Sequence, residues 1–228
     1  MRLFRMSGVL NYLNQGLTQM GVCTASVENG TPVNQTGGGG VNPTAVLHKN
    51  EWMVETVPLS TAQRLVCQFH YSKGGSNTAT YRHGLVRRGD YECLGVAWWI
   101  PPTKSAALAT YPQNWKGVLA LSRLVIHPSV PKNACSFLMA HSMRMIDREK
   151  WPCLVTYADE WQGHTGAIYL ATGWKFVGNT APEATFQLDG RMVARKAGPK
   201  TRTRAEMEAI GAVMVGRFSK RKFIHVAS

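Results

Sequence analysis

Short apolar segments rich in β-branched residues alternate with helical patterns between Glu51 and Gly178, and this alternation limits the fold more than any other feature. Apolar runs with a period of two predict strands, whereas a period of 3.6 residues predicts helices. Strands are predicted at 52–57, 91–100, 116–127, 153–158 and 174–178, and helices at 61–69 (capped by Ser60), 134–148 and 163–171. This order predicts an α/β fold.

Composition divides the chain into an N-terminal extension, an apolar domain and a basic C-terminal extension. These regions are predicted at 1–45, 46–190 and 191–228. The first contains four consecutive glycines, Gly37–Gly40, which predict a flexible linker, and a weakly amphipathic stretch at 3–17 that predicts a short helix. The third contains ten Lys or Arg residues against two Glu, with a helix predicted at 205–215.

The charge of the chain points to a polyanionic partner. Its 26 Lys and Arg residues exceed its 13 Asp and Glu residues and give a net charge of +13. Nucleic acid is the first candidate and an anionic membrane surface the second. The C-terminal cations could form a phosphate footprint or simply a solvated face. The predicted DNA-contacting residues are Arg195, Lys196, Lys200, Arg202, Arg204, Lys220, Arg221 and Lys222.

Secretion and membrane insertion are not predicted. The chain has no run of 18 apolar residues, and Asn11 and Asn14 interrupt the segment after its basic start. Five cysteines are widely spaced without a CxxC pair, which argues against a zinc knuckle or a disulfide framework. Buried thiols in a reducing cytoplasm are the simplest interpretation.

The segment 154–178 has the most polar residues at the end of a predicted buried strand. Tyr157 and Asp159 end that strand, where the sites of α/β sheets gather. His164 lies between two glycines before the next helix, whose free N–H groups could hold an anion. These residues could form an acid–base pair or bind a metal. Alternatively, Asp159 or Thr165 only caps that helix.

Two further polar pairs are candidates. Ser122-Arg123 lies within a predicted core strand, where polar side chains are costly unless they face a cleft or are fully paired. The alternative is a hydrogen-bonded core serine. His70-Tyr71 ends a predicted helix, where a histidine can also serve only as a partner of the helix dipole.

Three fragments in this order resemble the Mom family of phage DNA-modification proteins: His70–Gly74, Leu121–Leu124, and Tyr157–Glu160 with Gly163–Gly166. The resemblance covers about residues 50–200. The element order, ending in Ala171–Gly178, also resembles the GCN5-related N-acetyltransferase fold. These resemblances imply a mixed central sheet flanked by helices, with 46–190 as the catalytic domain. They imply an enzyme that attaches a carbamoylmethyl group to the exocyclic amine of adenine in duplex DNA and so protects a phage genome from host restriction.

The implied product joins nitrogen to a methylene carbon, a connectivity that direct acyl transfer from acetyl-coenzyme A does not produce. Residues 129–136 also stand where acetyltransferases have a glycine-rich pyrophosphate loop. Acetyl-coenzyme A therefore stays open as a cofactor, and a redox metal such as iron is an alternative. Under this resemblance the metal ligands or acid–base groups are His70, Asp159 and His164, and the pocket is lined by Tyr71, Ser122, Arg123 and Tyr157.

The adenine would have to leave the base stack to reach such a pocket, and a small molecule would donate the carbamoylmethyl group. The expected location is the host cell cytoplasm. Two other functions remain open. One is an ordinary coenzyme A-dependent acetyltransferase acting on a protein or small molecule, and the other is a non-catalytic DNA-binding protein.

Overall fold

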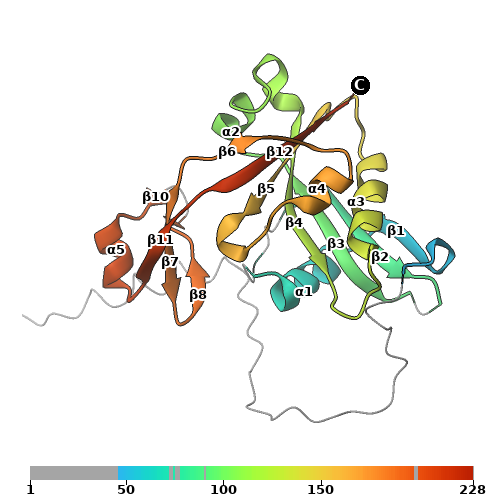
Figure 1. Cartoon of the computed structure of the whole chain (residues 1–228), viewed down its shortest axis with the longest axis horizontal. Coiled ribbons are helices and arrows are strands. Elements are labelled where there is room, and N and C mark those ends of the chain that lie inside the picture. The colour runs from blue at the N-terminus through green and yellow to red at the C-terminus, as the bar shows by residue number, and fades with distance from the viewer. Residues whose placement is uncertain (1–45, 72–73, 75–77, 90, 198–199, 228) are drawn as a thin grey trace, which may run out of the picture.

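The computed structural model describes residues 46–71, 74, 78–89, 91–197 and 200–227, and a mixed sheet forms its centre (Figure 1). The strands follow the order β1-β2-β3-β4-β5-β12-β6. Their bounds are β1 Trp52–Thr56, β2 Tyr81–Arg87, β3 Cys93–Ile100, β4 Val118–Ile126, β5 Cys153–Asp159, β6 Lys175–Asn179 and β12 Lys220–Val226. β4 and β5 pair in parallel, and the other neighbours pair antiparallel. The α/β class and the mixed central sheet with flanking helices are confirmed.

Helices cover both faces of this main sheet. α1 (Leu59–Phe69) buries Leu65 and Val66 against one face, and α3 (Ala134–Arg144) buries Leu138 and Met139 against the other. The other helical elements outside residues 183–218 are α2 Lys104–Leu108, α4 Ala167–Ala171, η1 Lys49–Glu51, η2 Pro112–Gly117 and η3 Glu160–Gln162. Both faces of the central strands are therefore apolar, as the continuous burial of β3 from Cys93 to Trp99 shows.

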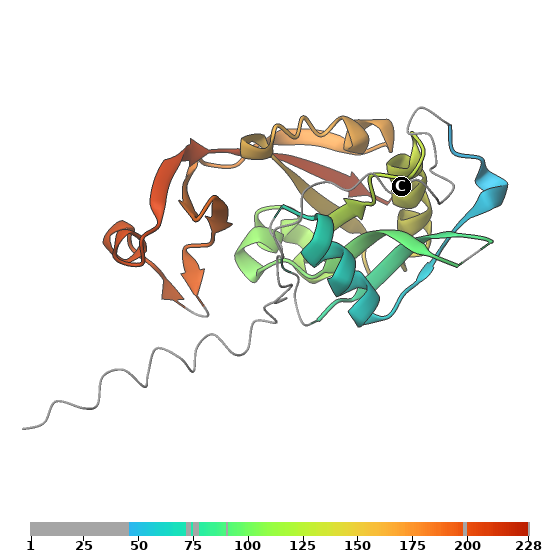
Figure 2. The same ribbon diagram turned by 90° about the horizontal axis from the view of Figure 1, so that it is seen from below.

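Residues 183–218 form a second, smaller unit, which we call the wing. Its sheet has the order β11-β7-β8, with β7 Glu183–Leu188, β8 Arg191–Val193 and β11 Val213–Phe218; a ribbon of β9 Lys196–Ala197 and β10 Lys200–Thr201 and the helix α5 Arg204–Ala209 complete it. Phe186, Met207 and Ala212 are its buried core. Figures 1 and 2 both show the wing to one side of the main sheet, where β6 and β12 lead into it.

Several element predictions were wrong in detail. β2 was not predicted. α1 begins at Leu59 after Pro58, so Ser60 lies within the helix rather than at its cap. The helix predicted at 205–215 ends at Ala209, because Gly211 takes a left-handed φ of 83° and β11 follows. The helix predicted at 163–171 is only α4, and the helix predicted at 3–17 lies outside the described residues.

The C-terminal residues differ most from the predicted organisation. β12 lies between β5 and β6, with Phe223 fully buried, so the predicted boundary at 191 does not separate residues 220–226 from the main sheet. The predicted extension at 1–45 lies outside the described residues.

The thiol prediction holds for part of the chain. Cys93, Cys135 and Cys153 are free, whereas Cys67 in α1 is disulfide-bonded, which the cysteine spacing did not predict. Among the described residues, no helix combines the length and apolarity that crossing a bilayer requires.

Candidate active site

The two parallel strands part at the middle of the main sheet. β4 pairs with β5 along Val118–Ala120, opposite Cys153–Val155, and the pairing ends there (Figure 1). In the pairing of β4 with β3, Trp98 faces Arg123 and Trp99 faces Leu121, so Ser122 is the extra residue of a β-bulge. A bulge bends its strand and re-aims the neighbouring side chains. The bulge therefore explains how the core strand β4 accommodates the polar side chains of Ser122 and Arg123.

Tyr71 connects the end of α1 with the end of β5. Its hydroxyl donates to Asp159 Oδ2 at 3.4 Å, and its ring stacks on His70 with centroids 4.3 Å apart. The ring of His164 meets it edge-on at 5.9 Å. Asp159 is only 7% exposed, and its Oδ1 accepts from the Trp161 N–H at 3.1 Å. Residues 88 positions apart thus form one polar cluster.

Arg123 supplies the positive charge of this cluster. Its Nε donates to the Gly74 carbonyl at 3.0 Å, and one terminal nitrogen donates to the carbonyl oxygen of Ser122 at 2.7 Å and to its Oγ at 3.2 Å. Burial lowers the pKa of Arg123, and the nearby Tyr71 opposes that shift. These three hydrogen bonds of the partly buried guanidinium are charge-assisted, the kind that offsets desolvation best.

The Tyr71 hydroxyl keeps its proton at neutral pH. Burial and the Asp159 carboxylate raise the pKa of Tyr71 to about 12, although the positive charge of Arg123 acts in the opposite direction. Tyr71 is therefore a hydrogen-bond donor to Asp159 rather than a base, and the carboxylate is the proton acceptor of the pair.

A pocket of about 430 Å³ lies on the α3 side of this cluster. Its lining includes Leu124, Ile126, Cys135, His164, Thr165 and Tyr169. His164 belongs both to the pocket and to the ring contacts of Tyr71, so it joins the two. Burial raises the pKa of Cys135 to about 11, which leaves its thiol neutral. The described lining of the pocket includes no Lys, Arg, Asp or Glu.

Gly166 lines the pocket at the start of α4. It has a φ of 79°, and a Cβ at this position would lie 2.2 Å from the Phe223 ring. The predicted opening of a long helix is thus a tight glycine turn followed by a five-residue helix. Thr165 Oγ1 accepts from the Ala167 N–H at 3.3 Å, so both residues suggested as caps, Asp159 and Thr165, do accept backbone N–H groups. Asp159 has a second partner in Tyr71, which capping alone does not explain.

The described residues do not form a recognisable set of ligands for either expected cofactor, a metal such as iron or acetyl-coenzyme A. Within the described part of the chain, no group of three or more His, Cys, Asp or Glu side chains is placed to hold a metal. The predicted ligands His70, Asp159 and His164 all lie around Tyr71: both imidazoles contact its ring, and the carboxylate accepts from its hydroxyl and from the Trp161 N–H. The pocket lining described by the structure includes no Lys or Arg, so it offers no cation for the phosphates of coenzyme A.

The structure brings together five of the six residues predicted as catalytic: His70, Tyr71, Ser122, Arg123 and Asp159. Tyr157 does not join them. Its side chain packs with Ala107 and Val155 beside α2, and Thr110 is its hydrogen-bond partner. Sequence reasoning missed Tyr169 and Cys135 in the pocket lining, for which the sequence has no local signal.

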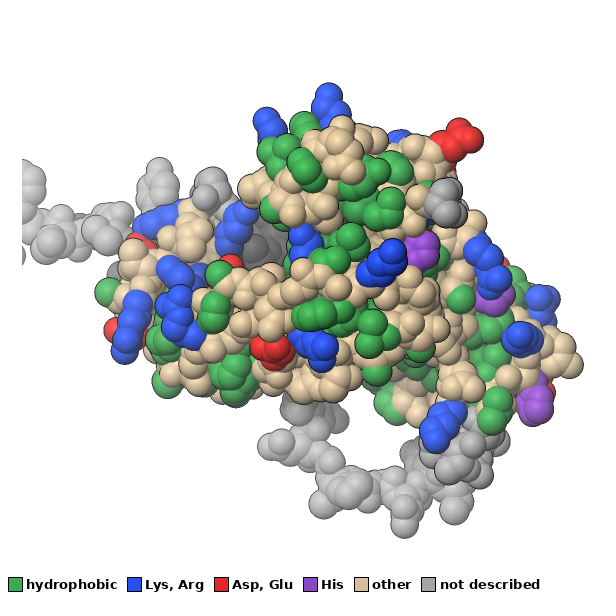
Figure 3. Space-filling view, turned by 45° about the horizontal axis from the view of Figure 1, so that its top comes forward, with side chains coloured by type: hydrophobic (Ala, Val, Ile, Leu, Met, Phe, Trp, Pro, Cys, Tyr) green, Lys and Arg blue, Asp and Glu red, His purple; other side chains and the backbone are tan. Residues whose placement is uncertain are grey.

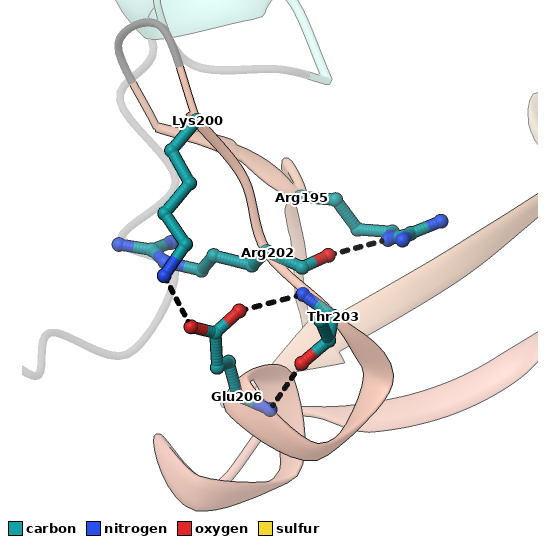
Figure 4. Close-up of polar contacts among 5 residues, drawn as sticks. All are labelled: Arg195, Lys200, Arg202, Thr203 and Glu206. Carbon is teal, nitrogen blue, oxygen red and sulfur yellow. Dashed lines mark hydrogen bonds and ion pairs between the residues drawn. The ribbon is translucent and has the colours of Figure 1, made fainter.

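The predicted DNA-contacting residues fall into two groups. Several are engaged within the protein (Figure 4): Lys200 pairs with Glu206, and Arg195 Nε donates to the Arg202 carbonyl at 3.0 Å. Arg204 pairs with Glu208 at 2.7 Å. In β12, Lys222 Nζ donates to the Ala109 carbonyl at 3.2 Å, and Arg221 lies 4.9 Å from the Phe176 ring centroid. Lys196 and Lys220 are exposed.

Residues 51–225 match the model of the Mom protein family, and the chain therefore belongs to that family. This confirms the resemblance carried by the three sequence fragments. Among individual proteins, the chain is similar to the methylcarbamoylase mom of Escherichia phage Mu, with 28% identity over 147 residues. That match covers 61% of this chain and 58% of the phage Mu protein.

The solved structures similar to this chain include acetyltransferases. The IAA acetyltransferase from Bacillus cereus has a TM-score of 0.47 at 9% identity, over 77% of this chain and 99% of that protein. A GCN5-related N-acetyltransferase from Kribbella flavida has a TM-score of 0.48 at 11% identity, over 79% of this chain and 100% of that protein. The fold class stated above is derived from the sheet of this chain.

Proposed function

We propose that this protein is a DNA-modifying transferase that attaches a carbamoylmethyl group to the N6 amine of adenine in duplex DNA. Support comes from membership of the Mom family and from the name of its relative, a methylcarbamoylase. The observation that carries the proposal is the Tyr71–Asp159–Arg123 cluster where β4 and β5 part, next to a pocket whose described lining includes no Lys, Arg, Asp or Glu.

The proposed reaction is a displacement at the methylene carbon of the donor. The adenine N6 lone pair forms the new N–C bond, while the bond from that carbon to the leaving group breaks and its electron pair departs with the leaving group. The N6 proton passes to the Asp159 carboxylate, because this buried group is the acceptor of the cluster. The donor class is therefore a small molecule whose carbamoylmethyl carbon carries a leaving group.

The other residues of the cluster have supporting roles in this proposal. Tyr71 stays protonated and fixes the orientation of the carboxylate through its hydrogen bond. Arg123 lies where it can stabilise negative charge that develops on the leaving group. The pocket lined by His164 would take the donor amide. The adenine must be extruded from the duplex to bring N6 to Asp159.

The expected biological role follows from the modified base. A phage genome that carries it resists host restriction endonucleases, and the reaction takes place in the host cell cytoplasm, where phage DNA is replicated.

The test is mass spectrometry of nucleosides from bacteria that express the full chain. We expect a heavier deoxyadenosine with the wild type and a decrease of at least about 100-fold with Asp159→Asn, the scale typical of general acid–base groups. Tyr71→Phe should cause a smaller decrease, because it removes only the hydrogen bond that orients the carboxylate. Asp189→Asn and Tyr91→Phe make the same chemical changes at exposed positions and should leave the yield unchanged. Unmodified adenine with the wild type would refute the proposal, and an acetylated protein or small molecule would indicate an ordinary acetyltransferase instead.

A further inference from the structure

The wing is attached to the main sheet directly beside Asp159. Lys220, the first residue of β12 and two residues beyond the end of the wing, pairs with Asp159 in the register of β12 and β5. Its N–H donates to Thr180 Oγ1 at 3.0 Å, and the Thr180 N–H donates to its carbonyl at 2.9 Å. The two connections of the wing are therefore bonded to each other at the end of β5 that carries the proposed proton acceptor.

An aromatic contact also joins the wing to the loop that follows Asp159. The ring of Trp161 in η3 lies 4.7 Å from that of Phe218, the last residue of β11. Arg217 donates to the Pro182 carbonyl at 2.8 Å and so links the two ends of the wing. These contacts fix the base of the wing relative to the carboxylate, and the wing has a small core of its own.

The cations on and beside the wing differ in whether they form an ion pair with a carboxylate. Lys200 and Arg204 form ion pairs with Glu206 and Glu208, and the Lys200 pair is part of the capping box of α5 (Figure 4). Lys196, Arg217 and Lys220 are exposed, and no carboxylate within salt-bridge distance of them is found among the described residues. Lys and Arg side chains gather on the visible face of the wing, with few acidic side chains between them (Figure 3).

We propose that the wing and Lys220 together hold the phosphate backbone of duplex DNA beside the base being modified, through Lys196, Arg217 and Lys220. Duplex DNA is the partner because its phosphates form a dense, regular row of negative charge that exposed cations on the strands β9, β11 and β12 can follow. The ion-paired Lys200 and Arg204 stabilise the wing and do not contact phosphate. This inference rests on the proposed function for the identity of the base, but the binding surface can be tested separately.

The test measures the affinity of the full chain for a labelled DNA duplex by fluorescence anisotropy over a series of salt concentrations. Each phosphate contact contributes about 0.9 to the slope of log affinity against log salt. We expect Lys196→Met, Arg217→Met and Lys220→Met each to reduce that slope by about 1 and to lower affinity roughly fivefold to tenfold at about 0.1 M salt. Lys200→Met and Arg204→Met remove the same charge and should leave the slope unchanged.

Equal effects of all five substitutions would overturn the inference, because net charge alone would then explain binding. Binding of the chain to vesicles of phosphatidylglycerol but not to the duplex would overturn it as well, in favour of a membrane surface. Circular dichroism spectra identical to the wild type would exclude unfolding of the variants as the cause of lost affinity.

The nucleoside assay separates this inference from the proposed function. Wing variants that bind and modify DNA as the wild type does would refute the inference and leave the function intact. A wild type that modifies no adenine, but binds the duplex through the three exposed cations, would refute the function and support the DNA-holding surface. Loss of modification in the triple variant Lys196→Met/Arg217→Met/Lys220→Met, restored by a higher DNA concentration, would support both.

Discussion

The cluster where β4 and β5 part and the wing use the same residue types in opposite environments. In the cluster, Arg123 and Asp159 lie largely out of solvent, and each holds several hydrogen bonds. On the wing, Lys196 and Arg204 are exposed. A buried charge is costly to retain without partners, whereas an exposed one costs little and acts at a distance. We therefore expect different parts of this chain to carry short-range chemistry and long-range attraction.

The largest difference in stability loss should come from removing one phenylalanine from the main sheet and one from the wing. Phe223 is completely buried against Tyr169 and Phe176, so Phe223→Ala should lower the free energy of unfolding by about 3–5 kcal/mol. Phe218 is only partly buried against Trp161, and Phe218→Ala should cost about 1–2 kcal/mol. Urea denaturation would measure both changes. Similar losses would mean that the wing base is as tightly packed as the main sheet.

The pH dependence of stability should come from the main sheet rather than the wing. His83 is 1% exposed, and burial lowers its pKa to about 4, while Ser142 Oγ lies 2.7 Å from its Nδ1. The folded state therefore favours the neutral ring. The stabilisation is complete above the unfolded pKa of about 6.5 and is lost as the pH falls from there towards 4, by about 1.4 kcal/mol per pH unit. Denaturation at stepped pH should show this slope.

His83→Asn is the matched variant for that slope. Its side chain can still meet Ser142 but does not titrate, so the pH dependence between about 6.5 and 4 should disappear even if the variant is less stable at neutral pH. A slope that persists in the variant would assign the effect to other groups.

Removing one arginine from each region should have a smaller effect on stability, and the loss should be larger in the cluster than in the wing. Arg123→Met removes the hydrogen bonds that the guanidinium donates to the Gly74 and Ser122 carbonyls and should cost about 1–3 kcal/mol, together with the loss of adenine modification. Arg204→Met breaks an exposed pair and should not change the denaturation midpoint measurably. Arg123→Lys keeps the charge but not the planar fork, so partial recovery of modification would show that charge matters. No recovery would indicate that the hydrogen-bond geometry decides.

The sequence predicted β3 and β4 well because their apolar runs are long and end close to Pro101 and Pro128. It missed β2, whose buried residues His83–Val86 include a histidine and a glycine that hide the apolar pattern. It extended the last helix past Gly211, since the apolar residues of β11 also fit a helical period. It placed β12 in an extension because its three basic residues outweigh the apolar ones that pack in the main sheet.

The candidate site was predictable in its residues but not in its geometry. Tyr71, Arg123 and Asp159 come from three separate segments, and only the family resemblance grouped them. The bulge at Ser122 and the parting of β4 from β5 have no local signal, because they depend on the register with neighbouring strands. Tyr157 was misplaced because strand position alone did not show that its side chain packs beside α2.

The smallest predicted effect belongs to the capping box of the wing. Hydrogen bonds from Lys200 and from the Thr203 N–H lower the pKa of Glu206 to about 2. Because the folded pKa lies below the unfolded one, this contribution is present above about pH 4.5 and is lost as the pH falls through 2. Glu206→Gln should therefore change stability slightly at neutral pH and not at all near pH 2, since the pair is exposed and screened by salt. NMR titration of the Glu206 carboxyl would measure the shift, and an ordinary pKa there would show that Lys200 is available to phosphate after all.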